Sequence, residues 1–162
     1  MGCGKSSVAM ALGAKMGRTV LDTDQLIVAK AGRAIPEIFT TEGEVFFRRL
    51  ETEILTDLQS VDASIIATGG GIVQNQKNWP LLRQLGRLYF LDAPWSELKK
   101  QIAVGDGRPL AGDGVNWQPV QTLWKRRLPL YRQADITIAT AGMSIDAVVE
   151  KILHDKERGS DD

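Results

Sequence analysis

The chain has 162 residues, 43% of them apolar and 25% charged, which is the length and composition of one ordinary globular domain. Twenty basic side chains balance twenty acidic ones, so neither a nucleic-acid nor an anionic-membrane partner is indicated. With one cysteine, Cys3, and one histidine, His154, the sequence excludes an intramolecular disulfide, a cysteine-rich zinc site and histidine-based catalysis.

No apolar run is long enough to span a bilayer, and the N-terminus has no signal-peptide pattern. We therefore expect a cytoplasmic protein. His154 lies near the polar C-terminal end and is expected to be a solvated surface residue.

The first residues match the end of a phosphate-binding loop. Gly4-Lys5-Ser6 fits the last three positions of G-x-x-x-x-G-K-[ST], where backbone N–H groups surround phosphate oxygens and the lysine reaches the β- and γ-phosphates. The hydroxyl after the lysine ligates Mg²⁺, and a helix over residues 8–16 would point its positive end at the anion. Because G-K-S alone is a weak pattern, a glycine-rich turn that caps this helix is the alternative.

Strand-like and helical patterns alternate along the whole chain. The expected strands cover residues 18–22, 64–68, 87–92 and 136–139. The expected helices after the first cover residues 25–32, 35–39, 43–59, 79–85, 95–104, 116–127 and 144–153. This alternation predicts an α/β fold in which a parallel sheet has helices on both faces.

Capping residues define several of these boundaries. Gly32 is expected to end one helix, and Ser144 is expected to be the N-cap of the last. Thr41 and Glu44 have the spacing of a capping box at the start of the long helix.

Polar or glycine residues follow two of the strands. Asp22 and Asp24 come at the carboxyl end of the first, where the alternatives are a ligand site or a helix N-cap with an exposed turn. Gly69-Gly70-Gly71 follows the second strand, and three glycines allow either a close approach of backbone to a ligand or a tight turn.

Five motifs in order resemble those of shikimate kinase, the small P-loop enzyme of aromatic amino-acid biosynthesis, over essentially the whole chain. They are Gly2-x-Gly4-Lys5-Ser6, Asp22-Thr23-Asp24, Gly43-Glu44-x-x-Phe47-Arg48, Gly69-Gly70-Gly71, and Arg108-Pro109-Leu110 followed by Leu130-Tyr131-Arg132. The resemblance implies a three-layer P-loop NTPase fold similar to nucleoside-monophosphate kinases. It implies a single domain over residues 1–162, with a mobile lid at about 105–115 and a frayed tail from about 155.

The resemblance further implies phosphorylation of the 3-hydroxyl of shikimate by ATP, with Mg²⁺, to give shikimate 3-phosphate and ADP. In that scheme the catalytic residues are Lys5, Asp24 and Arg108. ATP is bound by Gly2, Cys3, Gly4, Lys5, Ser6, Ser7 and Arg108, and Mg²⁺ by Ser6 and Asp22. Shikimate is bound by Asp24, Phe47, Arg48, Gly69, Gly70, Gly71 and Arg132.

Physical chemistry supports these implied roles. A planar guanidinium binds a carboxylate through two hydrogen bonds, which suits Arg48 and Arg132 to the carboxylate of shikimate. A lid arginine such as Arg108 would stabilise charge on the transferring phosphoryl group while closure excludes water.

The aromatic and basic side chains near these motifs are divided between core, solvent and substrate pocket. Phe47 is either plain core or a wall of the substrate pocket, whereas Phe46 is expected in the core and Arg49 in solvent. The basic run Lys125-Arg126-Arg127 is expected to be a solvated helix face. Contacts to adenine are not assigned.

The opening glycine of the phosphate loop would fall two positions before Met1. A chain that starts at Met1 would lack a central strand, and this loss is expected to exceed the roughly 5–15 kcal/mol by which domains are stable. We therefore expect the natural start to lie upstream. The alternative functions are a truncated, non-catalytic binding module, or a kinase for another small hydroxy acid such as gluconate. The expected oligomeric state is a monomer.

Overall fold

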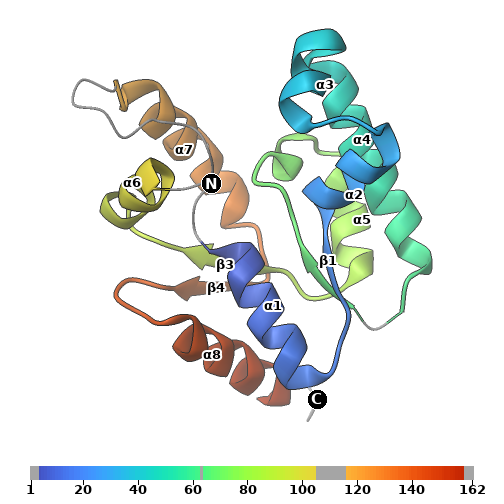
Figure 1. The fold of residues 1–162 in the computed structure, drawn as a ribbon. Helices are drawn as coiled ribbons and strands as arrows, with labels where there is room; N and C mark the ends of the chain where they lie inside the picture. Colours follow the sequence, from blue (N-terminus) through green and yellow to red (C-terminus); the bar gives the residue numbers. More distant parts are fainter. Residues whose placement is uncertain (1–3, 63, 105–115, 159–162) are drawn as a thin grey trace. The chain divides into compact units, whose positions relative to one another are not determined.

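The computed structural model describes residues 4–62, 64–104 and 116–158. The predictions for Gly2, Cys3, Arg108 and the lid therefore lie outside the described residues. In chain order the elements are α1 (Lys5–Met16), β1 (Val20–Asp22), α2 (Thr23–Ala31), α3 (Ile35–Thr41), α4 (Gly43–Asp57), η1 (Leu58–Ser60), β2 (Ile65–Ala67), η2 (Ile72–Gln74), α5 (Asn78–Leu85), β3 (Tyr89–Asp92), α6 (Trp95–Val104), α7 (Gln118–Tyr131), β4 (Ile136–Ala139) and α8 (Ile145–Arg158) (Figure 1).

The four strands that the sequence predicts are present, and their pairing is parallel. β1 pairs with β2 in the register Val20 to Ile65, and β3 pairs with β4 in the register Tyr89 to Ile136. The predicted α/β class with parallel strands is confirmed. Among the described residues the strands form two separate pairs, and no described strand hydrogen-bonds to both.

The chain divides into two compact units, one formed by residues 12–88 and the other by the described residues before and after them. In the 12–88 unit, α2, α3, α4 and α5 gather beside β1 (Figure 1). One core cluster of this unit joins a single face of α4 to one side chain each from α2, α3 and η1. Its buried members are Ile27, Ile38, Phe47, Leu50, Ile54 and Leu58.

In the other unit, side-chain contacts tie α6 and α8 to the strands. Glu97 of α6 accepts a hydrogen bond from the backbone N–H of Gly142, after β4, at 3.0 Å. The Tyr89 hydroxyl donates to the Asp155 carboxylate of α8 at 2.8 Å. This contact anchors α8 at Asp155 and the helix continues to Arg158, so the prediction of a frayed tail from about residue 155 is wrong for the described part of it.

The helix caps divide into correct and incorrect predictions. Gly32 ends α2 in the left-handed conformation with a φ of 64°, and Ser144 Oγ accepts the Ala147 N–H at 3.2 Å, as expected of these two caps. The capping box is wrong, because α3 runs directly into α4 and the Thr41 hydroxyl bonds back to Glu37 O within α3. Glu44 pairs with Arg48 instead.

Helix α7 continues four residues beyond its expected end at Arg127, through Pro129 to Tyr131. Arg132 is therefore the C-cap of this helix, and its backbone N–H donates to Leu128 O at 3.1 Å. None of the helices within the described ranges combines the length and apolarity needed to cross a bilayer.

Candidate active site

The predicted phosphate loop ends where α1 begins. Gly4 has a φ of 71°, which favours glycine, and its carbonyl accepts the Val8 N–H at 2.9 Å, so the first turn of α1 forms directly after it. Lys5 is half-buried, while Ser6 and Ser7 are exposed at this helix N-terminus. An N-terminus of this kind offers backbone donors and a positive dipole to an anion.

Asp22 caps α2 at the carboxyl end of β1. Its Oδ1 accepts the backbone N–H of Asp24 at 2.9 Å and that of Gln25 at 3.4 Å. The N-cap interpretation is therefore correct for Asp22, and the cap makes α2 begin at Thr23, two residues earlier than predicted. Asp24 falls in the first turn of α2 and is half-buried, so the exposed-turn alternative is wrong.

The glycine turn that follows β2 lies against Asp24 and Arg48. A Cβ added to Gly69 would collide with Asp24 Oδ1 and come within 3.3 Å of its Cγ. A Cβ added to Gly71 would collide with the Arg48 guanidinium, 2.8 Å from Nη2. Both glycines are buried, so these two positions have room for no side chain while Asp24 and Arg48 keep their places.

Thr23 joins the acidic motif to the same turn. Its fully buried Oγ1 accepts the backbone N–H of Gly69 at 2.9 Å. Parallel pairing of β1 with β2 places Asp22 opposite Ala67, which brings the ends of the two strands to the same edge. The sequence alone gives Thr23 no role, because a threonine between two acids carries no signal of a partner 46 residues away.

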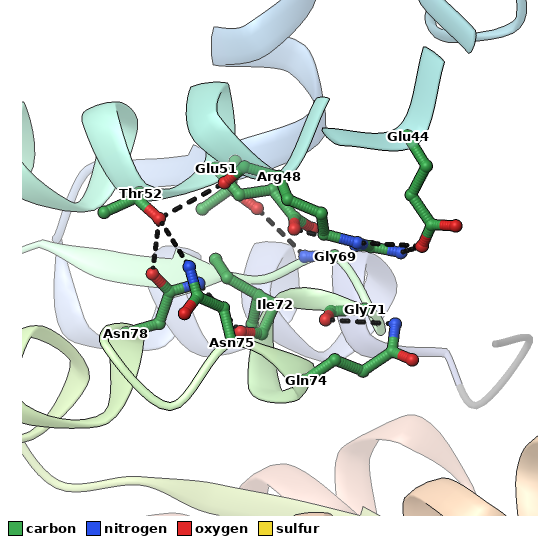
Figure 2. Close-up of polar contacts among 11 residues, drawn as sticks. Glu44, Arg48, Glu51, Thr52, Gly69, Gly71, Ile72, Gln74, Asn75 and Asn78 are labelled. Atoms are coloured by element: carbon green, nitrogen blue, oxygen red, sulfur yellow. Dashed lines mark hydrogen bonds and ion pairs between the residues drawn. The ribbon is translucent and has the colours of Figure 1, made fainter. Parts of the chain in front are cut away.

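Arg48 is held by two carboxylates of its own helix (Figure 2). Its Nη1 bonds Glu51 Oε2 at 2.7 Å and its Nη2 bonds Glu44 Oε1 at 2.9 Å. Burial alone lowers the pKa of Arg48, but the hydrogen bonds that it donates to Glu51 and Glu44, with the charges of these carboxylates, outweigh burial and hold the pKa above its ordinary value. Arg48 is therefore a fixed, permanently charged group.

Glu51 joins the candidate site through its ion pair with Arg48, although the sequence alone does not single it out. Its side chain is only 1% exposed, whereas that of Arg48 is 19% exposed. The signal available was its position three residues after Arg48 on a helix, a spacing that also occurs in many solvated pairs. A buried carboxylate needs such a partner, because an unbalanced charge in the core is costly.

The two phenylalanines of α4 differ from each other. Phe47 is 5% exposed, belongs to the core cluster and lies 4.7 Å from the Phe39 ring, with the Arg48 guanidinium 5.4 Å above its own ring. Phe46 is half-buried beneath exposed Arg49, so the expectation that Phe46 is core holds only in part. The core interpretation of Phe47 is therefore confirmed, and its role as a wall of the substrate pocket stays a prediction.

The remaining predicted residues belong to the other unit. Arg132 is exposed at the end of α7, next to Tyr131, whose ring stacks on Phe90 at 5.3 Å. Of the basic run, Lys125 and Arg126 are exposed as expected, but Arg127 is half-buried.

Within the 12–88 unit, then, the structure brings together a carboxylate, a guanidinium and a glycine turn. The members of this cluster are Asp24, Arg48, Gly69, Gly70 and Gly71. The Asp24 carboxylate can accept hydrogen bonds from the hydroxyls of a ligand, and the Arg48 guanidinium can bind a carboxylate of the same ligand. This pair of groups suits a small polyhydroxylated acid.

Comparisons with known proteins agree with this chemistry. A family model described as shikimate kinase matches residues 1–157. The shikimate kinase of Synechococcus elongatus is 39% identical over 154 residues, which are 94% of this chain and 80% of the relative. That of Chromohalobacter salexigens is 38% identical over 162 residues, 99% and 90% of the two chains.

Solved structures of the same family are also similar. The shikimate kinase of Acinetobacter baumannii in complex with shikimate superposes with a TM-score of 0.88 at 37% identity, covering 98% of this chain and 89% of the other. The shikimate kinase of Aquifex aeolicus gives a TM-score of 0.86 at 29% identity, covering 99% and 94%.

Proposed function

The chain belongs to the shikimate kinase family, and we propose that it transfers the γ-phosphoryl group of ATP to the 3-hydroxyl of shikimate, giving shikimate 3-phosphate and ADP. The observation that carries this proposal is the packing of Asp24 and Arg48 against one glycine turn. A related structure with 37% identity was solved with shikimate bound, which supports the same substrate here.

Arg48 binds the carboxylate of shikimate, together with Arg132. The ion pairs to Glu44 and Glu51 hold the Arg48 side chain in one orientation, so little rotamer entropy remains to be lost when shikimate binds. Gly70 donates its backbone N–H to the substrate, and the bond from the Gly69 N–H to Thr23 holds the start of the turn in place.

Asp24 accepts hydrogen bonds from the ring hydroxyls and takes the proton of the attacking one. As the 3-oxygen bonds to the γ-phosphorus, its proton passes to the Asp24 carboxylate and the bridging oxygen leaves with ADP. Transfer of this kind depends mainly on positioning and charge neutralisation, so a carboxylate base suffices.

The end of the phosphate loop binds ATP through Lys5, the backbone N–H groups of Gly2 to Ser7 and the N-terminus of α1. Arg108 stabilises negative charge on the transferring group. Ser6 and Asp22 would hold Mg²⁺, which when bound neutralises phosphate charge. One hydroxyl and one carboxylate fit this ion, because Mg²⁺ bound to nucleotides takes few protein ligands and keeps several waters.

A coupled assay of ADP release with ATP, Mg²⁺ and shikimate tests the proposal. We expect turnover that requires shikimate and stops when Mg²⁺ is chelated. Turnover with gluconate in place of shikimate would indicate the kinase for another hydroxy acid, and folded protein silent with both would indicate a non-catalytic binding module. A cytoplasmic location and a monomeric state remain predictions.

Two neighbouring glycine substitutions are expected to affect different kinetic constants. Gly71→Ala pushes the Arg48 guanidinium aside and should raise the KM for shikimate about tenfold, while Gly69→Ala displaces the Asp24 carboxylate and should lower kcat more than it raises KM. Neither glycine has a positive φ, so the backbone itself tolerates alanine. Steady-state kinetics checks the split, and equal effects on both constants in both variants would contradict it.

Arg132→Ala is expected to raise the KM for shikimate by about a hundredfold and the KM for ATP by less than about threefold, because one of two guanidinium contacts to the carboxylate is lost. Arg126→Ala is the matched control, since Arg126 is an exposed arginine of the same helix. Equal losses for the two substrates would rule out the carboxylate role.

A further inference from the structure

The glycine turn is held at both ends by buried side chains that do not belong to the proposed substrate contacts. At its start, Gly69 N–H donates to Thr23 Oγ1 at 2.9 Å. At its end, the carbonyl of Ile72 accepts Asn78 Nδ2 at 2.8 Å. Thr23 and Asn78 are both fully buried, so water does not compete for these two bonds.

Asn78 is in turn fixed by a hydrogen-bond relay through α4. The Thr52 hydroxyl donates to Asn78 Oδ1 at 2.7 Å and accepts Asn75 Nδ2 at 3.1 Å (Figure 2). A hydroxyl has one proton, so the 2.7 Å contact takes it in preference to the 3.2 Å contact with Arg48 O. The relay thus begins and ends in the segment after the glycine turn and crosses α4 at Thr52.

Thr52 lies four residues after Arg48, on the same face of α4 and one turn along it. The Arg48 guanidinium in turn lies against Gly71. Figure 2 shows both residues together with the relay of Thr52, Asn75 and Asn78. The relay therefore ties the turn that carries Gly70 to the helix that carries Arg48, with Thr52 as the connecting residue.

We propose that Thr52 and Asn78 are positioning residues for the substrate, and that with Thr23 they set the place of the glycine turn relative to Arg48. This inference rests on the proposed function, since shikimate is the ligand whose carboxylate and hydroxyls the turn and Arg48 would bind. If the turn is displaced, the Gly70 N–H and the Arg48 guanidinium no longer lie where both can bind shikimate at once. The binding of shikimate is then weaker, and the binding of ATP is unchanged.

The test replaces the connecting hydroxyl and keeps its shape. Thr52→Val should raise the KM for shikimate about tenfold, with the KM for ATP and kcat within about twofold of wild type. Thr52→Ser keeps the hydroxyl and should restore the wild-type KM. Thr56→Val is the matched control, because Thr56 lies one turn further along α4 and its hydroxyl bonds the Thr52 carbonyl of the same helix.

A second measurement uses the free protein and needs no turnover. Amide hydrogen exchange in a peptide covering residues 69–74 should be faster in Thr52→Val than in wild type and unchanged in Thr56→Val. An unchanged KM for shikimate in Thr52→Val, with only a lowered melting temperature, would overturn the proposal. If the wild-type protein shows no shikimate-dependent turnover, the proposed function fails. If, in addition, Thr52→Val exchanges its amides at residues 69–74 at the wild-type rate, the positioning role is overturned as well.

Discussion

Replacing Asp24 by alanine is expected to abolish detectable shikimate-dependent turnover, a loss in kcat of at least about a thousandfold. A positioned base contributes about 10²–10⁴ in rate, and Asp24 also orients the hydroxyls whose proton it takes. ATP binding should stay within about twofold of wild type, because Asp24 is assigned to shikimate and not to the nucleotide. Binding of a fluorescent ATP analogue, measured beside ADP release, separates the two effects.

The control for this variant is Asp57→Ala, which removes a carboxylate that is 61% exposed and pairs with Lys30 on the surface. An exposed ion pair contributes little to stability, so we expect wild-type kinetics from it. Asp24→Asn is a sharper second variant, since the amide keeps the size of the side chain and can still accept from a hydroxyl. It should bind shikimate better than Asp24→Ala and turn over as poorly. Loss of ATP binding in either Asp24 variant would show that the residue has been assigned to the wrong substrate.

The sequence points to residues of short motifs better than to the partners that hold them. Asp24, Arg48 and the three glycines stand out because each is part of a motif of fixed spacing, and the structure places Asp24 and Arg48 against the glycine turn, while their roles toward the substrate stay predictions. Glu51 and Thr23 were missed because their importance comes from partners and burial. A glutamate one turn after an arginine is ordinary on a helix, and only its 1% exposure distinguishes this one.

The errors in the fold have a similar origin. A capping box was predicted at Thr41 because the local pattern fits, but the pattern does not reveal that α3 ends at Thr41 itself. The end of α8 was placed too early because the residues after Leu153 are charged, whereas Asp155 has a partner in Tyr89 on a distant strand. Local signals predicted element type and order, and tertiary contacts decided the boundaries.

Arg48→Ala is expected to affect both binding and stability, and the two effects can be separated. Loss of the guanidinium removes a proposed contact to the carboxylate of shikimate, so the KM for shikimate should rise by about a hundredfold or more. It also removes the 2.7 Å ion pair that the buried carboxylate of Glu51 makes with Arg48. We expect the free energy of unfolding to fall by about 3 kcal/mol, at the lower end for a broken buried ion pair, because the partly exposed position lets water replace some of the interaction.

The double variant Arg48→Ala/Glu51→Gln distinguishes these two roles. A neutral amide at position 51 removes the buried charge that had paired with Arg48, so most of the lost stability should return, while the KM for shikimate should remain as high as in Arg48→Ala. Urea unfolding and steady-state kinetics on wild type, the two single variants and the double variant give the full cycle. If the double variant recovered the KM as well, Arg48 would act on shikimate only by stabilising α4. If Arg48→Ala unfolded at the wild-type urea concentration, the Arg48–Glu51 pair would have no structural role, and Arg48 would serve the substrate alone.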